Sequence, residues 1–218
     1  MGRAVAPIGV PRHSRLVAVQ LGDRDVKLDR SAVRFPVELR LPPGFDASVP
    51  ATWPRVDGHL EYVNGRLLFM PPSGDEQQDV AIDVALVLGG WSEQQTGFVV
   101  GGNEAGMLLG GEVRAADVAV WRRDQTAPRT GGYRRVAPIL AVEIAGQEDD
   151  EASLREKAQW YLAHGVEAVW LVLPTTRDVV VLTTTGEWRG SGDAAVPAHA
   201  ALPGLAPTVD RFFAQLSR

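Results

Sequence analysis

Ile139-Leu140-Ala141-Val142-Glu143-Ile144-Ala145 is a short apolar run interrupted by one carboxylate. Such a run is typical of a strand buried on both faces of a sheet, where an ionised glutamate is costly unless it is paired or binds a metal. An earlier segment, residues 113–121, repeats the arrangement with Asp117 inside it. Two acids on two buried strands, followed by a lysine on the next helix, indicate a metal-dependent hydrolase.

The segments around these acids predict a mixed sheet. Asn64-Gly65 between two apolar runs indicates a two-residue hairpin. Residues 75–91 have the spacing of a helix, and a second helix with a capping box at Ser153–Glu156 separates the strands expected at residues 139–145 and 167–173. Such a strand–helix–strand unit forms a right-handed parallel crossover. The expected fold class is α/β (α+β), with a mixed central β-sheet flanked by helices. Further strands are expected at residues 98–100, 107–109 and 179–183, and a short terminal helix at residues 208–216.

Length and composition favour one globular domain with an appendage. The chain has 218 residues, of which 45% are hydrophobic, which is enough to build an ordinary core. Residues 1–50 are interpreted as an N-terminal extension, because the short apolar runs at residues 16–19 and 33–37 are interrupted by proline and charge. Residues 51–218 are expected to form the functional domain.

Composition also bears on location and partners. The chain contains no cysteine, which excludes thiolate metal sites and fits a reducing cytoplasm. No segment approaches the roughly 18 apolar residues that span a membrane, so we expect a cytoplasmic protein without a membrane partner. The net charge of −5 argues mildly against nucleic acid, yet five arginines gather between residues 122 and 135. A solvated loop and a nucleic-acid contact both remain open for this stretch.

Asp117, Glu143 and Lys157 are the residues expected to carry the chemistry. Two carboxylates on adjacent strands can hold Mg²⁺ through oxygen and leave positions for water and phosphate. The alternative is that either acid ends a strand in solvent. On a helical wheel Lys157 lies at the edge of the apolar arc of its helix. There it either stabilises charge on a scissile phosphate or is an ordinary surface lysine.

Four stretches resemble the Uma-two family, which belongs to the restriction-endonuclease-like PD-(D/E)XK nucleases. They are residues 60–67 (LEYVNGRL), 113–120 (VRAADVAV), 137–144 (APILAVEI) and 156–172 (EKAQWYLAHGVEAVWLV). The resemblance covers about residues 53–213, and its last stretch is the most specific. It implies a restriction-endonuclease-like core.

The resemblance also implies roles for individual residues. Asp117 and Glu143 match the two acidic metal ligands, and the carbonyl of Ile144 matches a third ligand. The implied metal is Mg²⁺, with Mn²⁺ as the alternative. Lys157 matches a helical lysine that replaces the one usually found two positions after the second acid. Glu61 matches an acid that approaches the metal through water, with an exposed strand glutamate as an equal alternative.

Several positions depart from the family pattern. They are Ala145 for the usual lysine, Ala116 for proline, Gln77 or Gln78 for a histidine, Ser153 for an aspartate and Gly146 for a serine. Because Asp117, Glu143 and Lys157 still match the family, the expected function is a metal-dependent endonuclease that hydrolyses phosphodiester bonds in DNA. The alternative is a catalytically weakened nucleic-acid-binding or protein-interaction module that retains the fold. RNA or a nucleotide-containing small molecule would need the same chemistry, and a homodimer is expected by analogy with many nucleases of this fold.

Overall fold

The computed structural model describes the backbone of residues 16–21, 24–29, 35–147 and 149–217, with side chains from residue 35 onwards in those ranges. Its strands are β1 (Leu16–Leu21), β2 (Arg24–Asp29), β3 (Val37–Leu39), β4 (His59–Val63), β5 (Arg66–Met70), β6 (Phe98–Leu109), β7 (Glu112–Arg122), β8 (Leu140–Ile144), β9 (Ala168–Leu173), β10 (Asp178–Thr183) and β11 (Gly186–Ser191). Its α-helices are α1 (Asp75–Glu93) and α2 (Glu151–Ala163). Short 3₁₀ helices are η2 (Pro50–Thr52), η3 (Arg123–Gln125), η4 (Val209–Phe213) and η5 (Gln215–Ser217).

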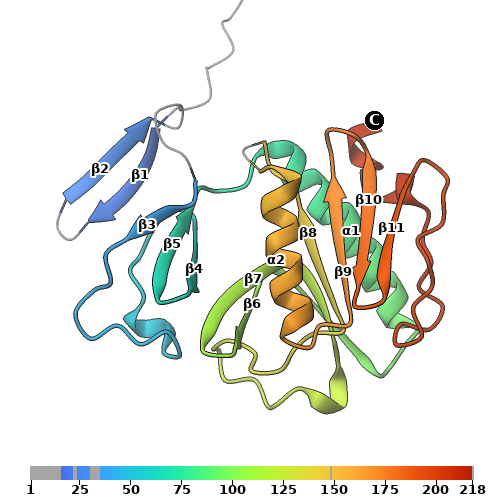
Figure 1. Cartoon of the computed structure of the whole chain (residues 1–218), viewed down its shortest axis with the longest axis horizontal. Coiled ribbons are helices and arrows are strands. Elements are labelled where there is room, and N and C mark those ends of the chain that lie inside the picture. Colours follow the sequence, from blue (N-terminus) through green and yellow to red (C-terminus); the bar gives the residue numbers. More distant parts are fainter. Residues whose placement is uncertain (1–15, 22–23, 30–34, 148, 218) are drawn as a thin grey trace, which may run out of the picture.

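The described strands form two sheets. β1 and β2 make an antiparallel pair, and the other nine strands form a mixed sheet in the order β11-β10-β9-β8-β7-β4-β5-β3, with β6 paired to β7. β8 and β9 run parallel on either side of the α2 crossover, as predicted. The helix α1 covers one face of the sheet together with η4, and α2 covers the other (Figure 1). The predicted α/β class with a mixed central sheet is confirmed.

The main sheet divides at Asp117. Tyr62 of β4 pairs with Val113 near the start of β7, whereas β8 pairs with Val118–Val120 further along β7. Because β6 follows β7 along both halves, β4 and β8 share the other edge of β7. Figure 1 accordingly shows β4 and β5 standing apart from β8, with β6 and β7 connecting the two parts. We call this division the fork.

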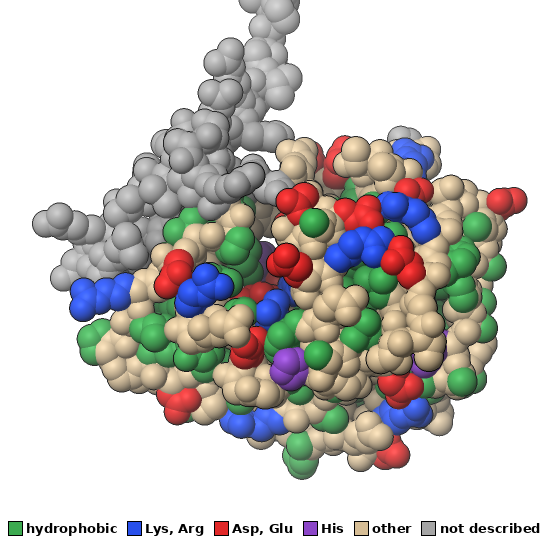
Figure 2. Space-filling model, in the orientation of Figure 1, with side chains coloured by type: hydrophobic (Ala, Val, Ile, Leu, Met, Phe, Trp, Pro, Cys, Tyr) green, Lys and Arg blue, Asp and Glu red, His purple; other side chains and the backbone are tan. Residues whose placement is uncertain are grey.

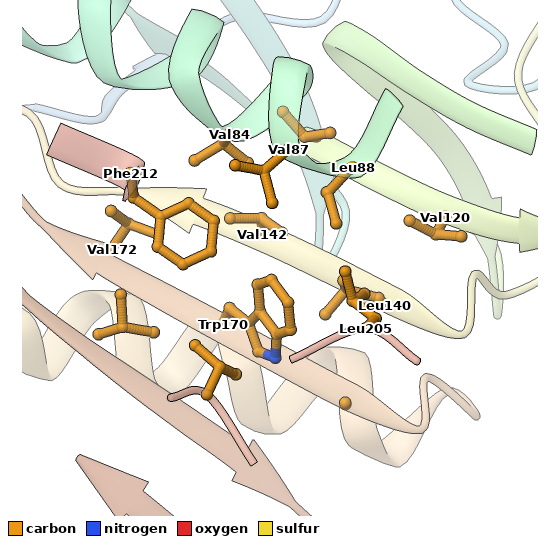
Figure 3. Close-up of a cluster of buried hydrophobic side chains, with 14 of the residues drawn as sticks. Val84, Val87, Leu88, Val120, Leu140, Val142, Trp170, Val172, Leu205 and Phe212 are labelled. Carbon is orange, nitrogen blue, oxygen red and sulfur yellow. The ribbon is translucent and has the colours of Figure 1, made fainter. Parts of the chain in front are cut away.

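The largest core cluster lies between α1 and the strands β8 and β9. Val142 and Trp170 are cross-strand partners, and the Trp170 side chain is 2% exposed. In Figure 3 this indole lies between Phe212 and the aliphatic side chains of Leu140 and Leu205. Val84 and Leu88 of α1 belong to the same cluster and lie beyond Val142 in this view. Every residue of β8 is buried, so the strand that carries Glu143 is fixed from both sides.

From β4 onwards, the strand pattern differs from the sequence expectation in two places, and in the N-terminal region β2 is a further strand that the sequence analysis does not predict. The sequence predicts separate strands at residues 98–100 and 107–109, but β6 is continuous and contains a bulge between Gly102 and Ala105. The glycines and polar residues in the middle of β6 hide the strand from an apolar pattern. β11 is not predicted at all, because its side chains are mostly exposed and lack apolar alternation.

The helix ends also differ. The capping box predicts that Ser153 caps α2, but the N-cap is Asp150, whose Oδ1 accepts a 2.7 Å hydrogen bond from the Ser153 N–H. Asp and Ser are equally good N-caps, so the sequence pattern alone does not choose between them. The terminal helix expected at residues 208–216 is instead the two 3₁₀ turns η4 and η5.

The N-terminal region is described in part. β1 contains the strand expected at residues 16–19, and β3 pairs antiparallel with β5 at one edge of the main sheet. Of the strand expected at residues 33–37, residues 33–34 lie outside the described residues. The division into an extension of residues 1–50 and a domain of residues 51–218 remains a prediction. Among the described helices, none is long and apolar enough to cross a membrane.

Replacing Trp170 with alanine should lower the free energy of unfolding by about 3–5 kcal/mol, because removal of a fully packed indole leaves a cavity between β8, β9 and α1. Trp188 of β11 is only partly buried against the same cluster, so Trp188→Ala is the matched control and should cost less. Urea denaturation followed by circular dichroism measures both. Equal losses in the two variants would contradict this account of the core.

Candidate active site

Asp117 and Glu143 come together at the fork. Val118 and Val142 are the last paired residues of β7 and β8 at this end, and the two acids occupy the next position on each strand. Oδ2 of Asp117 accepts a 2.7 Å hydrogen bond from the backbone N–H of Ile144. The two acids, distant in sequence, therefore share one site.

The side chain of Lys157 fills the fork from α2. Its ammonium donates a hydrogen bond of 2.8 Å to the backbone carbonyl of Ala115 on β7. It also lies 2.9 Å from Oε1 of Glu61 on β4 and 2.9 Å from Oε2 of Glu143 on β8. These three contacts match the three protons of an ammonium group. The interpretation of Lys157 as an ordinary surface lysine is therefore wrong.

Glu61 is part of the same cluster. Its side chain accepts a second hydrogen bond, 3.1 Å long, from the backbone N–H of Ala115. Glu61 is only 6% exposed, which excludes the alternative of an exposed strand glutamate. The carboxylate therefore joins the unpaired backbone of β7 to the ammonium of Lys157 and closes the β4 side of the fork.

Tyr161 holds the other oxygen of Glu143. The Tyr161 hydroxyl donates a 2.7 Å hydrogen bond to Oε1 of Glu143, while Lys157 donates to Oε2. Lys157 and Tyr161 are four residues apart on α2, and such residues lie on the same face of a helix. The sequence places Tyr161 on the apolar side of this helix without indicating that its hydroxyl contacts the acid.

Glu104 is a site residue that sequence reasoning missed. It lies in the β6 bulge, where Asn103 and Glu104 have φ of 55° and 59°. Between the pairs Gly102–Val118 and Ala105–Ala116, these two residues stand opposite Asp117 alone. Bulges of this kind re-aim side chains beside functional sites. The sequence around it, Gly101 to Gly106, has no strand pattern, so the only signal was an Asn-Glu pair between two predicted strands.

His59 accompanies Glu104 at the edge of the cluster. Nε2 of His59 lies 3.4 Å from Oε1 of Glu104, and His59 is two residues before Glu61 on β4. Residues two apart on a strand face the same way. Burial, together with the positive charge of Lys157, lowers the pKa of His59. The pair therefore adds a carboxylate and an imidazole beside the acids that the sequence identifies.

Gln77 of α1 occupies the remaining side of the site. Its side-chain amide donates a 3.0 Å hydrogen bond to the backbone carbonyl of Ile144, the predicted third metal ligand. A Cβ at position 146 would lie 3.0 Å from Oε1 of Gln77, so glycine there leaves room for the amide. Two departures from the family pattern, Gln77 and Gly146, are thus neighbours.

Burial and the neighbouring carboxylates both raise the pKa values of the acids in the cluster. Burial raises the pKa of Asp117 to about 7, and the nearby Glu104 adds to the effect. Burial also raises the pKa of Glu104 to about 7, with Lys157 opposing the shift. The pKa of Glu143 is likewise raised by burial. Burial disfavours the charge of Lys157, but Glu143 and Glu61 hold its pKa well above the usual range.

Figure 2 shows acidic and basic side chains meeting in a hollow between the part of the molecule that contains β3, β4 and β5 and the part that contains α2. The structure thus brings together the predicted residues Asp117, Glu143, Lys157, Glu61 and the backbone of Ile144. Glu104, His59, Tyr161 and Gln77 complete the cluster, which we call the acid cluster.

The comparisons with known proteins agree with this architecture. The model of the family Uma2, described as "Putative restriction endonuclease", matches residues 51–210. The chain belongs to the Uma2 family. The resemblance found in the sequence is thereby confirmed, and the description of the family points to hydrolase chemistry of the restriction-endonuclease type.

One solved structure similar to this Uma2 protein is titled as "a putative nuclease belonging to DUF820 from Anabaena variabilis ATCC 29413". It has a TM-score of 0.67 and 18% sequence identity, and the match covers 76% of this chain and 96% of the other. At that identity the match shows a shared fold. No curated protein matches the chain.

The oxygens of the acid cluster fit the divalent metal that Uma2 membership implies. Carboxylates of Asp117 and Glu143 and the carbonyl of Ile144 are hard ligands of the kind that Mg²⁺ and Mn²⁺ take. A cation would also offset the negative charge of the neighbouring carboxylates, which adds to burial in raising the pKa values of Asp117, Glu104 and Glu143. Among the described residues, no three His, Asp or Glu side chains form a group that could hold a metal. A cation would therefore need the carbonyl oxygen and water besides two carboxylates.

Lys157→Met should lower the free energy of unfolding by about 3–5 kcal/mol at pH 8, because it leaves the buried carboxylates of Glu61 and Glu143 without their cation. Arg155→Met is the control, since Arg155 lies on the same helix but pairs at the surface with Glu151 and Glu187. That variant should lose about 1 kcal/mol or less. Chemical denaturation measures the free energy of unfolding of both variants. Similar losses would contradict the prediction that the buried contacts of Lys157 stabilise the protein more than the surface pairs of Arg155.

Stability of the metal-free protein should fall as pH rises from about 5 to 8. Asp117 and Glu104 have folded-state pKa values raised to about 7, so the folded form binds more protons than the unfolded form in this window. Asp117→Asn should flatten the fall, whereas Asp193→Asn, at an exposed position, should leave it unchanged. Melting temperatures across the window in EDTA test this. A fall of the same size in Asp117→Asn would contradict it.

Proposed function

We propose that this Uma2 protein is a divalent-metal-dependent endonuclease that hydrolyses phosphodiester bonds in DNA. The observation that supports it best is the meeting of Asp117, Glu143 and Lys157 at the fork. Asp117 and Glu143 point into one site from two neighbouring strands, and the ammonium enters from the following helix. An acid–acid–lysine order on a strand–strand–helix frame is the arrangement that the family resemblance implies.

The metal would be held by Asp117, Glu143 and the carbonyl of Ile144, and it would supply positive charge beside the scissile phosphate together with a bound, more acidic water. The rest of the work falls to the chain itself. Tyr161 and Lys157 fix the two oxygens of Glu143. The amide of Gln77 holds the carbonyl of Ile144 in place.

Lys157 has a second task beyond positioning Glu143. Hydrolysis joins a water oxygen to phosphorus and breaks the bond from phosphorus to a sugar oxygen, while negative charge grows on the phosphate. An ammonium held beside the two acids would offset part of that charge. Glu61 and the Ala115 carbonyl hold it there.

A binding module without catalysis is the second candidate, and two observations favour it. The three N–H groups of Lys157 are engaged by Ala115, Glu61 and Glu143. The carbonyl of Ile144 already accepts a hydrogen bond from Gln77. Both groups would have to share or exchange these bonds to act on a phosphate or a metal. Such a module would bind nucleic acid or a protein with the fold intact.

Cleavage of plasmid and linear DNA with Mg²⁺ or Mn²⁺ tests the nuclease. Asp117→Asn keeps the size of the side chain and removes its charge, so it should abolish metal-dependent cleavage. Asp193→Asn, at an exposed position, should cleave like the wild type. Unchanged cleavage by Asp117→Asn would count decisively against the assignment.

Calorimetric titration with Mg²⁺ and Mn²⁺ separates the two candidates. The nuclease requires a saturable site that Glu143→Gln weakens, whereas the binding module requires none. Parallel assays with RNA decide whether DNA is the preferred polymer. A homodimer and a cytoplasmic location remain predictions, which light scattering and fractionation test directly.

A further inference from the structure

An arginine-lined pocket lies outside the acid cluster. Arg123, Arg129 and Arg134 contribute to a cavity of about 400 Å³ next to β6 and β7. The other lining residues are neutral, among them Val99 of β6 and Thr126. These arginines belong to the basic stretch whose role the sequence left open. We call the cavity the arginine pocket.

Arg134 is held in a fixed position. Its guanidinium lies 4.5 Å from the centroid of the Trp121 ring, a cation–π arrangement on a buried indole. Its backbone N–H donates to Gly106, and its carbonyl accepts from Leu108, so the loop is tied to β6 at this point. A charge fixed in this way loses little side-chain freedom when it binds a ligand.

Arg123 is fixed as well, while Arg129 is free to adapt. The guanidinium of Arg123 donates to the carbonyls of Thr96 and Phe98 at 2.9 and 2.8 Å. Arg129 is exposed. Among the described residues, no carboxylate forms an ion pair with any of the three arginines, whereas neighbouring Arg122 pairs with Glu167.

The three positive charges therefore lack a counter-charge from the protein. Burial lowers the pKa of Arg134, and the nearby positive charge of Arg129 lowers it further. Like charges held together raise the free energy of the folded state, and an anion in the pocket would reduce that cost. Arginine favours phosphate in particular, because its planar fork binds two oxygens at once.

The pocket lies on the same side of the sheet as the acid cluster. Trp121 is four residues after Asp117 on β7, and residues at even spacing on a strand share a face. At about 3.3 Å per residue the two are about 13 Å apart along the strand. Phosphates of one strand follow each other every 3.4 Å or so along a duplex, so about four nucleotides cover that distance.

We propose that the arginine pocket binds the phosphodiester backbone of the nucleic acid whose cleavage we assign to the acid cluster. The inference rests on the proposed function in so far as the substrate is a nucleic acid. Free phosphate and anionic lipid headgroups have the same chemistry. A polynucleotide is favoured because its phosphates repeat over the distance along β7 from Trp121, which the Arg134 guanidinium contacts, to Asp117.

Fluorescence anisotropy with a labelled duplex oligonucleotide, and with its single strand, tests the proposal in EDTA so that no hydrolysis occurs. Arg129→Glu should weaken binding roughly tenfold and Arg129→Ala less, and the alanine variant should lower the slope of log affinity against log salt by about one phosphate contact. Arg211→Glu makes the same charge change on η4, which packs on the α1 face of the sheet. It should bind like the wild type.

Equal binding by Arg129→Glu and Arg211→Glu would overturn the proposal, as would the absence of binding by the wild type. Phosphatidylserine vesicles and inorganic phosphate are the competing probes. If the wild type binds the vesicles or inorganic phosphate more tightly than the oligonucleotide, and Arg129→Glu loses that binding, the pocket is a site for lipid headgroups or for free phosphate instead. The cleavage assay stands apart: binding that depends on Arg129 without any cleavage refutes the nuclease and keeps the pocket. If Arg129→Glu cleaves and binds DNA like the wild type, the nuclease assignment stands and the role of the arginine pocket is refuted.

Discussion

The ammonium of Lys157, bonded at once to three strands, is the interaction on which this fold and its site depend. The division of the sheet at Asp117 leaves backbone and carboxylate groups of β4, β7 and β8 facing one another without a continuous ladder. One cation from α2 satisfies a group on each strand. A buried charge is tolerated only with such complete pairing, so the contacts that stabilise the sheet also fix the position of the acids.

The acidic surplus follows from the same arrangement. Four carboxylates, those of Glu61, Glu104, Asp117 and Glu143, lie around one lysine, and burial together with their mutual repulsion raises the pKa values of the last three. The surplus strains the metal-free protein at neutral pH, and the same surplus gives the site its attraction for a divalent cation. A change that removes one of these negative charges should therefore stabilise the metal-free protein and weaken its affinity for a divalent cation.

The sequence was sufficient to place those site residues whose neighbours in the chain indicate the strand or helix that carries them. Glu143 interrupts an apolar run that is typical of a buried strand, and Lys157 follows on a helix with a clear apolar arc. A parallel crossover then brings strand and helix together. Ser153 illustrates a limit, because Asp150 and Ser153 are equivalent caps by type and only the loop geometry makes Asp150 the cap.

Other parts of the site could not be predicted, since they depend on register between strands far apart in the chain. Nothing local to Glu104 shows that it stands opposite Asp117, because that depends on one extra residue in β6. The contact of Gln77 with the Ile144 carbonyl likewise joins α1 to β8 across the core. Pattern analysis detects the faces of elements, whereas these contacts arise from the way the elements are assembled.

The left-handed backbone at Asn103 and Glu104 has a consequence for how this protein can vary. Asparagine tolerates that conformation, but glutamate does so at an energetic cost that glycine would avoid. A mutation to glycine at position 104 would relax the chain and erase a negative charge in the same step. Selection for thermostability and selection for an acidic centre would thus pull this one codon in opposite directions.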